Sequence, residues 1–213
     1  MRPGGGPYFA LMAVIGITGS IASGKSALRD LLAPLLPAET LDADLIARNL
    51  LDQDPDVRVR VKAGISPRAY RADGSADRLE IRRIIYSDPA AKSRLEAILH
   101  PLVRKTWTAA ASLAREENRH LIVDIPLLFE TGAAGHFDFV ITVACSPEVQ
   151  NARLAARGIA PDLARSILST QMPAAEKISR STQVVWNDGS LAALEAQARE
   201  FAATLTGSAG VLP

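Results

Sequence analysis

A glycine-rich motif directly after a short apolar run is the feature that most constrains this chain. Residues Gly19–Ser26 read GSIASGKS, with two glycines, a lysine and a serine at the spacing of a phosphate-binding loop. In such a loop, backbone N–H groups turn toward phosphate oxygens. We expect Lys25 to neutralise the β- and γ-phosphates and the Ser26 hydroxyl to hold Mg²⁺. The alternative is a glycine-rich turn that carries a lysine by chance.

Short apolar runs alternate with helical patterns along the rest of the chain, which predicts an α/β fold with a parallel sheet and right-handed crossovers. The block 54–119 is mostly helical and too long for one crossover, so we expect it to form a cap or substrate domain. Strands are expected at 13–18, 39–42, 120–124, 137–144 and 183–186. Helices are expected at 24–36, 45–51, 78–86, 90–99, 102–117, 146–157, 161–171 and 190–205.

Composition excludes several classes of protein. One cysteine and three histidines in 213 residues argue against a disulfide framework and against a zinc or iron–sulfur site. A net charge of +1 gives no global field for nucleic acid or an anionic membrane. The run Phe9–Ile17 faintly resembles a signal peptide but leads straight into the glycine motif, so a cytoplasmic enzyme is expected. Residues 1–12 and 207–213 are expected to be flexible ends.

Carboxylates follow two of the expected strands. Asp42 and Asp44 close the second strand, and Asp124 ends the third. The carboxyl ends of parallel strands line the crevice where ligands bind, so these residues could position Mg²⁺ and accept a proton. The alternatives are an N-cap role for Asp42 or Asp44 and a capped strand end for Asp124.

Basic residues give weaker signals. Arg153 and Arg157 lie four apart on one expected helix face and could stabilise charge on a transferring phosphate; a solvated basic face is the alternative. Asp77–Arg78 and Arg82–Arg83 are candidate anion-binding residues in the helical block, where plain surface charge is the stronger alternative.

Two single residues remain. His100 precedes Pro101 between two expected helices and could be a polar turn residue or a substrate contact. Cys145 ends an apolar strand and is expected in the core.

Size and motifs together favour a small-molecule kinase. No Asn/Thr-Lys-x-Asp element is present for reading guanine, and a mechanochemical ATPase needs a longer chain. A kinase of nucleosides or nucleotides, and a protein that senses nucleotide without turnover, are the competing hypotheses.

Taken in order, the motifs of the chain resemble the dephospho-CoA kinase family, from about Ala13 to Leu205. Each motif beyond the glycine loop is weak alone, but the ordered set is specific. The segments that carry the resemblance are Ile15–Ser26, Leu41–Arg48, Asp77–Arg78, Ser87–Pro89, Leu95–Pro101, Asp124–Glu130, Gln171–Pro173 and Asn187–Ser190.

The resemblance implies a nucleotide-kinase-like core with a five-stranded parallel sheet, at 13–53 and 120–206. It also implies a helical CoA-binding domain at 54–119 and a small lid at about 150–175. The implied reaction uses ATP, with Mg²⁺, to phosphorylate the ribose 3′-hydroxyl of 3′-dephospho-CoA in the last step of CoA synthesis. That small molecule is the expected partner, with no nucleic acid or membrane, and the protein is expected to be a monomer or weak homo-oligomer.

The resemblance also implies roles for single residues. Asp44 matches the catalytic base, helped by Lys25 and Arg153, while Ser26, Asp42 and Asp124 are the candidate metal ligands. The nucleotide is expected on Gly19, Ser20, Ile21, Ala22, Ser23, Gly24, Lys25, Ser26 and Ala27, with Arg157, Asn187 and Gly189. Dephospho-CoA is expected on Asp44, Asp77, Arg78, His100, Pro126 and Leu127.

Two stretches depart from the family pattern. Ser20 and Ala22 stand where the family often has glycines; small residues still fit, with less loop flexibility. Residues 63–76 match the usual pattern poorly.

Overall fold

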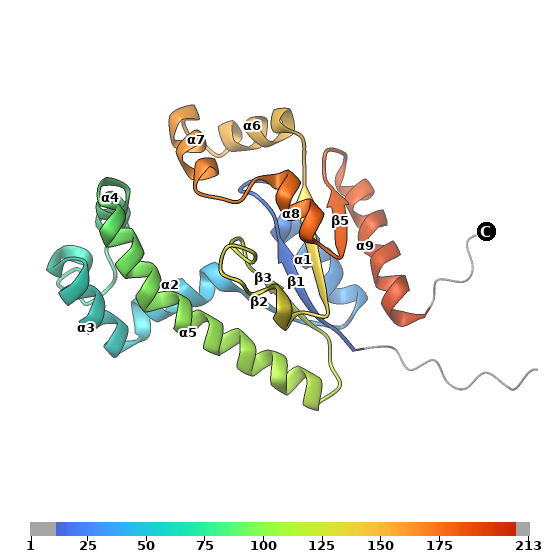
Figure 1. The fold of residues 1–213 in the computed structure, drawn as a ribbon, viewed down its shortest axis with the longest axis horizontal. Helices are drawn as coiled ribbons and strands as arrows, with labels where there is room; N and C mark the ends of the chain where they lie inside the picture. The colour runs from blue at the N-terminus through green and yellow to red at the C-terminus, as the bar shows by residue number, and fades with distance from the viewer. Residues whose placement is uncertain (1–11, 208–213) are drawn as a thin grey trace, which may run out of the picture. The chain divides into compact units, whose positions relative to one another are not determined.

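A five-stranded sheet with helices between its strands organises the computed structural model, which describes residues 12–207 (Figure 1). The strand order is β2-β3-β1-β4-β5, and the fold is the expected α/β fold with a parallel sheet. The strands are β1 Val14–Thr18, β2 Glu39–Asp42, β3 Leu121–Asp124, β4 Phe139–Ala144 and β5 Gln183–Trp186.

The central strand β1 positions the glycine motif. All five residues of β1 are buried, which explains its unbroken apolar sequence. Ile17 pairs with Asp124 of β3 on one side and with Ile141 of β4 on the other. Because these strands are parallel, the loop after Thr18 emerges at the same sheet edge as the end of β3.

Two helices cover one hydrophobic core of the sheet. α1 Lys25–Leu35 and α9 Leu191–Thr206 pack together, and both contribute to the apolar cluster around β1. Leu28 and Leu32 of α1 are fully buried there, and each such side chain contributes about 1.5–3 kcal/mol to folding. The remaining helices of this part are α6 Pro147–Ala156, α7 Pro161–Ser169 and α8 Ala174–Arg180, with the short η2 Ala134–His136.

The chain divides into two compact units, and each has its own apolar cluster. One unit is Asp42–Ala110, and the other comprises the residues before Asp42 and after Ala110. The core of the Asp42–Ala110 unit joins residues such as Val57, Val61 and Ile81. Its elements are α2 Ala43–Gln53, α3 Pro55–Gly64, η1 Pro67–Ala69, α4 Arg78–Ser87 and the first part of α5 Pro89–Glu116.

The expectation of two helices at 90–99 and 102–117 was wrong, because α5 runs unbroken from Pro89 to Glu116. Pro101 removes one backbone N–H but does not end the helix. Leu99, Val103 and Trp107 are buried at four-residue spacing across it, so packing on both sides outweighs the cost of the proline. His100 therefore lies on a helix surface, exposed, and not in a turn.

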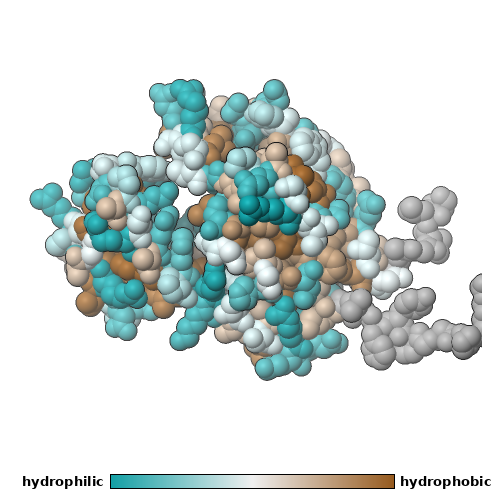
Figure 2. Space-filling model, in the orientation of Figure 1, coloured by the Kyte–Doolittle hydropathy of each residue, from teal (hydrophilic) through white to brown (hydrophobic). Residues whose placement is uncertain are grey.

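Neither the chain ends nor the surface gives further information about the function. Of the expected flexible ends, only Met12 and Gly207 belong to the described residues. The face in Figure 2 mixes hydrophilic and hydrophobic residues. Within residues 12–207, no helix is both long enough and apolar enough to cross a membrane.

Candidate functional site

The loop Gly19–Ser26 links β1 to α1, and both of its glycines occupy places that a side chain could not share. Gly19 has φ +147°, and a Cβ there would lie 2.3 Å from the Val143 carbonyl oxygen. Gly24 has φ +106°, and its Cβ would lie 2.1 Å from Nδ2 of Asn187. Since α1 begins directly after Gly24, the positive end of the helix dipole lies at the loop. The loop thus meets the requirements of a phosphate site.

Two side chains from later in the chain, Asn187 and Arg153, donate hydrogen bonds to backbone carbonyls of the loop. Asn187 is buried, and its Nδ2 donates to the Ser23 carbonyl at 2.8 Å. Arg153 of α6 donates to the carbonyls of Ala22 and Ser23 at 3.5 and 3.3 Å, and to that of Asn187 at 2.9 Å. Arg153 therefore supports the loop in this structure, and its contact with a transferring phosphate stays a prediction.

Lys25, Ser26 and Asp124 supply the charged and hydroxyl groups beside the loop. Lys25 Nζ donates to the Ser20 carbonyl at 3.2 Å. Ser26 Oγ donates to Asp124 Oδ2, 3.4 Å away, and Asp124 is buried at the end of β3.

This pair of oxygen ligands fits Mg²⁺. In protein–phosphate sites, Mg²⁺ takes only one or two protein oxygens and completes its shell with phosphates and water. Ser26 and Asp124 match that requirement. Among the described residues, no group of three or more His, Cys, Asp or Glu side chains is arranged to hold a metal ion.

A pocket of about 390 Å³ lies beside the loop, a size that suits a small ligand. Its floor is apolar, and Arg153, Arg157 and Asn187 are its polar members. Most of its lining was predicted for the nucleotide. The lining residues are Ala22, Gly24, Ala27, Arg153, Ala156, Arg157, Asn187, Gly189, Leu191 and Leu194.

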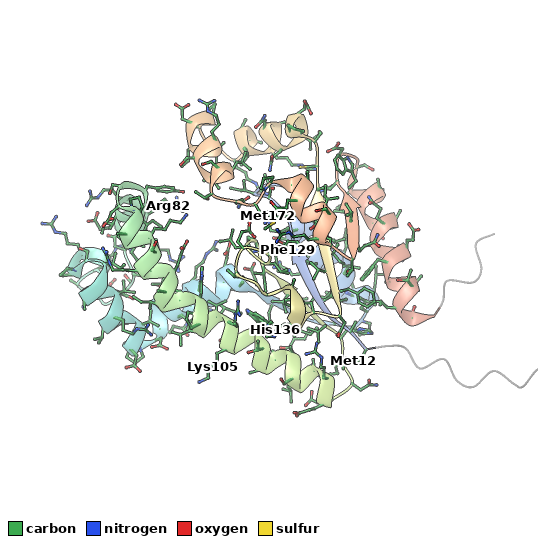
Figure 3. The ribbon with its side chains drawn as sticks, viewed as in Figure 1. Met12, Arg82, Lys105, Phe129, His136 and Met172 are labelled. Atoms are coloured by element: carbon green, nitrogen blue, oxygen red, sulfur yellow. The ribbon has the colours of Figure 1, made fainter. Side chains whose placement is uncertain are left out.

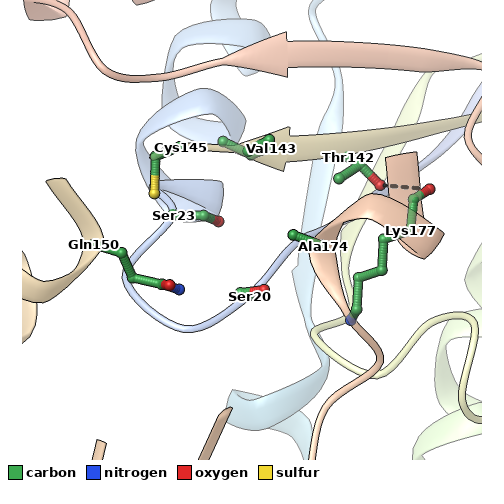
Figure 4. Close-up of a pocket in the computed structure, with 9 residues that line it drawn as sticks. Ser20, Ser23, Thr142, Val143, Cys145, Gln150, Ala174 and Lys177 are labelled. Atoms are coloured by element: carbon green, nitrogen blue, oxygen red, sulfur yellow. Dashed lines mark hydrogen bonds between the residues drawn. The ribbon is translucent and has the colours of Figure 1, made fainter. Parts of the chain in front are cut away.

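A second cavity, of about 20 Å³, adjoins the loop on the β4 side (Figure 4). Ser23 Oγ is buried on its wall and has no hydrogen-bond partner among residues 12–207. The volume suffices for one water molecule that could satisfy this hydroxyl. Cys145 also lines this cavity; it was expected in the core, but it is only half-buried. This burial raises the pKa of its thiol, and the Arg153 guanidinium lowers that pKa by a smaller amount.

Pro126 and Leu127, predicted to contact the substrate, follow β3 in the same unit as the loop. The Pro126 carbonyl accepts hydrogen bonds from Thr18 Oγ1 at 3.1 Å and from Lys177 Nζ at 2.7 Å. The Leu127 carbonyl accepts from Thr131 Oγ1 at 2.8 Å. These bonds fix the backbone of the segment beside the end of β1.

Lys177 of α8 is a buried cation that the sequence had not singled out. Its side chain is 0% exposed and its Nζ lies 2.9 Å from Glu130 Oε1. Glu130 also accepts the Met172 N–H at 2.8 Å, and Figure 3 shows Met172 near Phe129, the neighbour of Glu130. This ion pair ties α8 and the segment before it to the loop after β3.

Asp42 and Asp44 belong to the Asp42–Ala110 unit and lie at the start of α2. Asp42 Oδ1 accepts the Leu45 N–H at 3.0 Å, so Asp42 is the N-cap of α2, one of the two roles left open. Asp44 lies exposed in the first turn of the helix. The expected metal and base roles of these two residues stay predictions.

Asp77 and Arg78, in the same unit, both have structural partners. Asp77 caps α4 by accepting the Glu80 N–H at 3.1 Å, and this bond holds the pKa of Asp77 below its usual value. Arg78 forms an ion pair with Asp52 at 2.5 Å. Arg82, labelled in Figure 3, is exposed on α4. Substrate contacts by these residues stay predictions.

Several residues of the site carried no clear signal in the sequence. Leu191 and Leu194 appear as one face of an ordinary amphipathic helix, and nothing in the sequence places them at a pocket. Lys177 resembles any surface lysine of a short helix. Gln171 belongs to a motif that resembles the family, but the motif implied no role for it; in the structure its Oε1 accepts the Ile21 N–H of the loop at 3.1 Å.

A profile of the dephospho-CoA kinase family matches residues 13–193. Among curated proteins, the dephospho-CoA kinase of Thiobacillus denitrificans is 39% identical over 188 residues, which cover 87% of this chain and 92% of the relative. The dephospho-CoA kinase of Desulfotalea psychrophila is 36% identical over 190 residues, covering 89% of this chain and 96% of the relative.

Solved structures agree on the fold. A Thermus thermophilus protein is 34% identical with a TM-score of 0.76, and the match covers 92% of this chain and 99% of the other. The dephospho-CoA kinase of Campylobacter jejuni is 25% identical with a TM-score of 0.70, covering 92% and 98%. Shikimate kinase of Acinetobacter baumannii, at 13% identity and a TM-score of 0.56, shares the fold alone.

Proposed function

Because this chain belongs to the dephospho-CoA kinase family, we propose that its glycine loop and the residues around it carry out phosphoryl transfer from ATP to dephospho-CoA. The enzyme makes CoA, as its family does. In our proposal the ribose 3′-hydroxyl oxygen attacks the γ-phosphorus, the bond from that phosphorus to the β–γ bridging oxygen breaks, and ADP leaves. The hydroxyl proton passes to Asp44.

The observation that supports ATP binding most directly is the loop with its adjoining pocket. The Ile21 N–H donates to Gln171 and the Ser23 N–H to the Ser20 carbonyl. The other N–H groups of the loop and of the start of α1 would bind the phosphates, and Lys25 would neutralise their charge. The base would lie in the pocket of about 390 Å³, against Asn187, Gly189 and Arg157. Ser26 and Asp124 would hold Mg²⁺, which supplies charge neutralisation between the phosphates when bound.

We propose that the CoA-binding part, expected at 54–119, corresponds to the compact unit Asp42–Ala110. It carries 13 Lys+Arg against 10 Asp+Glu, whereas the remainder of the chain has 11 against 13. Dephospho-CoA carries a diphosphate, so a basic surface favours its binding. Asp77, Arg78 and His100 of this unit, with Pro126 and Leu127 of the other, are the proposed substrate contacts, and Asp42 supports the Mg²⁺ waters.

The test is an ADP-release assay on the full chain with dephospho-CoA as the only acceptor, followed by mass analysis of the product. We expect one phosphoryl group added at the ribose, loss of activity with EDTA, and recovery with Mg²⁺. AMP, uridine and shikimate serve as control acceptors. If one of these is phosphorylated and dephospho-CoA is not, the substrate assignment is wrong.

The cytoplasmic location and the monomeric or weakly associating state are also proposals. Light scattering during size-exclusion chromatography at several concentrations tests the second. A mass that stays at twice that of one chain on dilution would contradict it.

A further inference from the structure

We propose that Gln150 and Gln171 are positioning residues that hold both polar groups of Ile21 and so keep the glycine loop in the shape that binds ATP phosphates. The inference deepens the proposed function, since it rests on ATP binding at this loop. Neither glutamine is expected to touch the reacting atoms.

The hydrogen bonds to Ile21 come from two places in the chain. The Ile21 N–H donates to Gln171 Oε1 at 3.1 Å. Gln150 Nε2 donates to the Ile21 carbonyl at 2.7 Å. Gln150 lies on α6, and Gln171 follows the end of α7, so the helical segment between them is fastened to one loop residue at both of its ends.

The side chains of the loop reinforce this attachment. Ala22 is buried in a small apolar cluster with Leu154 of α6 and Ala164 of α7. Ile21 and Leu168 pack against the same cluster. The α6–α7 segment thus contacts the loop through apolar side chains as well as through the two glutamines.

The orientation of the loop carbonyls gives the arrangement a function. In a phosphate-binding loop the N–H groups turn toward the ligand, so the carbonyls between them must turn away and find donors elsewhere. Three successive carbonyls do so here: that of Ile21 accepts from Gln150, while those of Ala22 and Ser23 accept from Arg153 and Asn187. Figure 4 shows Gln150 reaching toward the loop that carries Ser20 and Ser23. Gln150 is therefore one of three residues whose side chains bind the loop carbonyls and keep them turned away from the phosphate side.

The two glutamines differ in the polarity that each must supply, and this gives a matched test. Gln150 must donate, and Gln171 must accept. Glutamate has nearly the shape of glutamine and adds the same charge at either position. Only at 171 can its carboxylate still accept the Ile21 N–H; at 150 it would oppose a carbonyl oxygen.

The experiment measures the ATP Kd, ATP KM, kcat and Tm of the full chain carrying Gln150→Glu or Gln171→Glu. We expect the ATP Kd and KM of Gln150→Glu to exceed those of Gln171→Glu about tenfold. Only Gln150→Glu loses its hydrogen bond to the loop and places a carboxylate against the Ile21 carbonyl oxygen, which it repels. We expect kcat at saturating ATP to differ by less than about threefold between the two variants. Gln183→Glu, an exposed change at the amino end of β5, is the charge control and should bind ATP like the wild type.

Gln150→Met and Gln171→Met remove each bond without adding charge and serve if a glutamate variant does not fold. Each should weaken ATP binding about fivefold. The proposal is overturned if the two glutamate variants weaken ATP binding equally, or if the folded Gln150→Met variant lowers Tm alone and binds ATP like the wild type. Because Kd is measured without acceptor, a wild type that binds ATP but leaves dephospho-CoA unchanged would reject the proposed function and not this inference.

Discussion

Several positions of the Gly19–Ser26 loop are constrained by a few neighbouring atoms. Gly24 is fixed by Asn187, whose Nδ2 would collide with any Cβ there. Ala22 has φ +62°, in the left-handed region, which glycine adopts more easily than alanine. That conformation costs an alanine about 1 kcal/mol, and burying its methyl group regains about 0.8 kcal/mol. The two terms nearly cancel, which explains how the loop tolerates Ala22.

Lys25→Ala should remove most turnover while the protein stays folded. A pre-placed cation at a phosphate contributes about 3–4 kcal/mol to transition-state stabilisation, so kcat should fall by roughly 10²–10³. Lys25 is only partly buried and its Nζ donates within its own loop, so Tm should change little. Lys105→Ala, an exposed change on α5, is the control. An unchanged kcat in Lys25→Ala would contradict the assignment of the loop.

Asp44→Asn should lower kcat by about 10²–10⁴, the span typical of a general base, with little change in ATP Kd. Asp42→Asn should cost less activity. Asparagine caps helices about as well as aspartate, so α2 keeps its N-cap and any loss of activity does not come from unfolding. Steady-state kinetics and ATP titrations on both variants make the comparison. If Asp42→Asn is inactive and Asp44→Asn is active, the two roles are reversed.

Among the elements, α8 depends on one buried ion pair. The seven-residue helix Ala174–Arg180 is too short to be stable by itself. Lys177 anchors it through Glu130 and the Pro126 carbonyl. The same Glu130 carboxylate binds the backbone of Met172, so the anchor also fixes the segment that carries Gln171.

Lys177→Met should therefore lower the free energy of unfolding by about 3 kcal/mol, the lower end for a broken buried pair, because Glu130 is partly exposed. The apolar stem is retained, so the loss reports the charge and its hydrogen bonds. Arg199→Met removes the exposed Glu195–Arg199 pair of α9 and should cost no more than about 0.5 kcal/mol. Denaturant unfolding of both variants measures the difference. Equal losses would show that burial of Lys177 adds nothing.

For the whole molecule, stability should fall as the pH drops below about 7, because of one histidine. Burial lowers the pKa of His120 below its ordinary value near 6.5, and its Nδ1 accepts the Ala13 N–H at 3.2 Å. The unfolded chain therefore binds a proton at higher pH than the folded one. The contribution of His120 to stability is complete above its pKa in the unfolded chain and is lost as the pH falls through its lower pKa in the folded protein.

His120→Asn keeps an acceptor for the Ala13 N–H and does not titrate, so its unfolding free energy should vary less than that of the wild type over this range. Asp77 and Asp188, whose pKa values are lowered by the N–H groups of Glu80 and Ser146, lose their contributions only below the ordinary carboxyl pKa near 3.9. Their effect is thus separated from that of His120. A wild-type slope retained in His120→Asn would assign the pH dependence to other groups.

Local patterns in the sequence determined the alternation of elements and the nucleotide loop. The strand β1 is apolar throughout because both of its faces are buried, and such a run is visible without a structure. The glycine motif is visible for the same kind of reason, since its backbone shape demands glycine at two positions. The ordered motifs also identified the family.

Only the tertiary structure decided the roles that depend on partners far along the chain. Pro101 predicted the end of a helix, but buried side chains on both sides of it stabilise α5 as one continuous helix. Lys177 and Gln150 look like surface residues, yet each finds its partner about 50 to 130 residues away. The physical reason is that a hydrogen bond or an ion pair leaves no periodic trace in the sequence. Its free energy depends on burial and geometry, which exist only once distant segments have packed together.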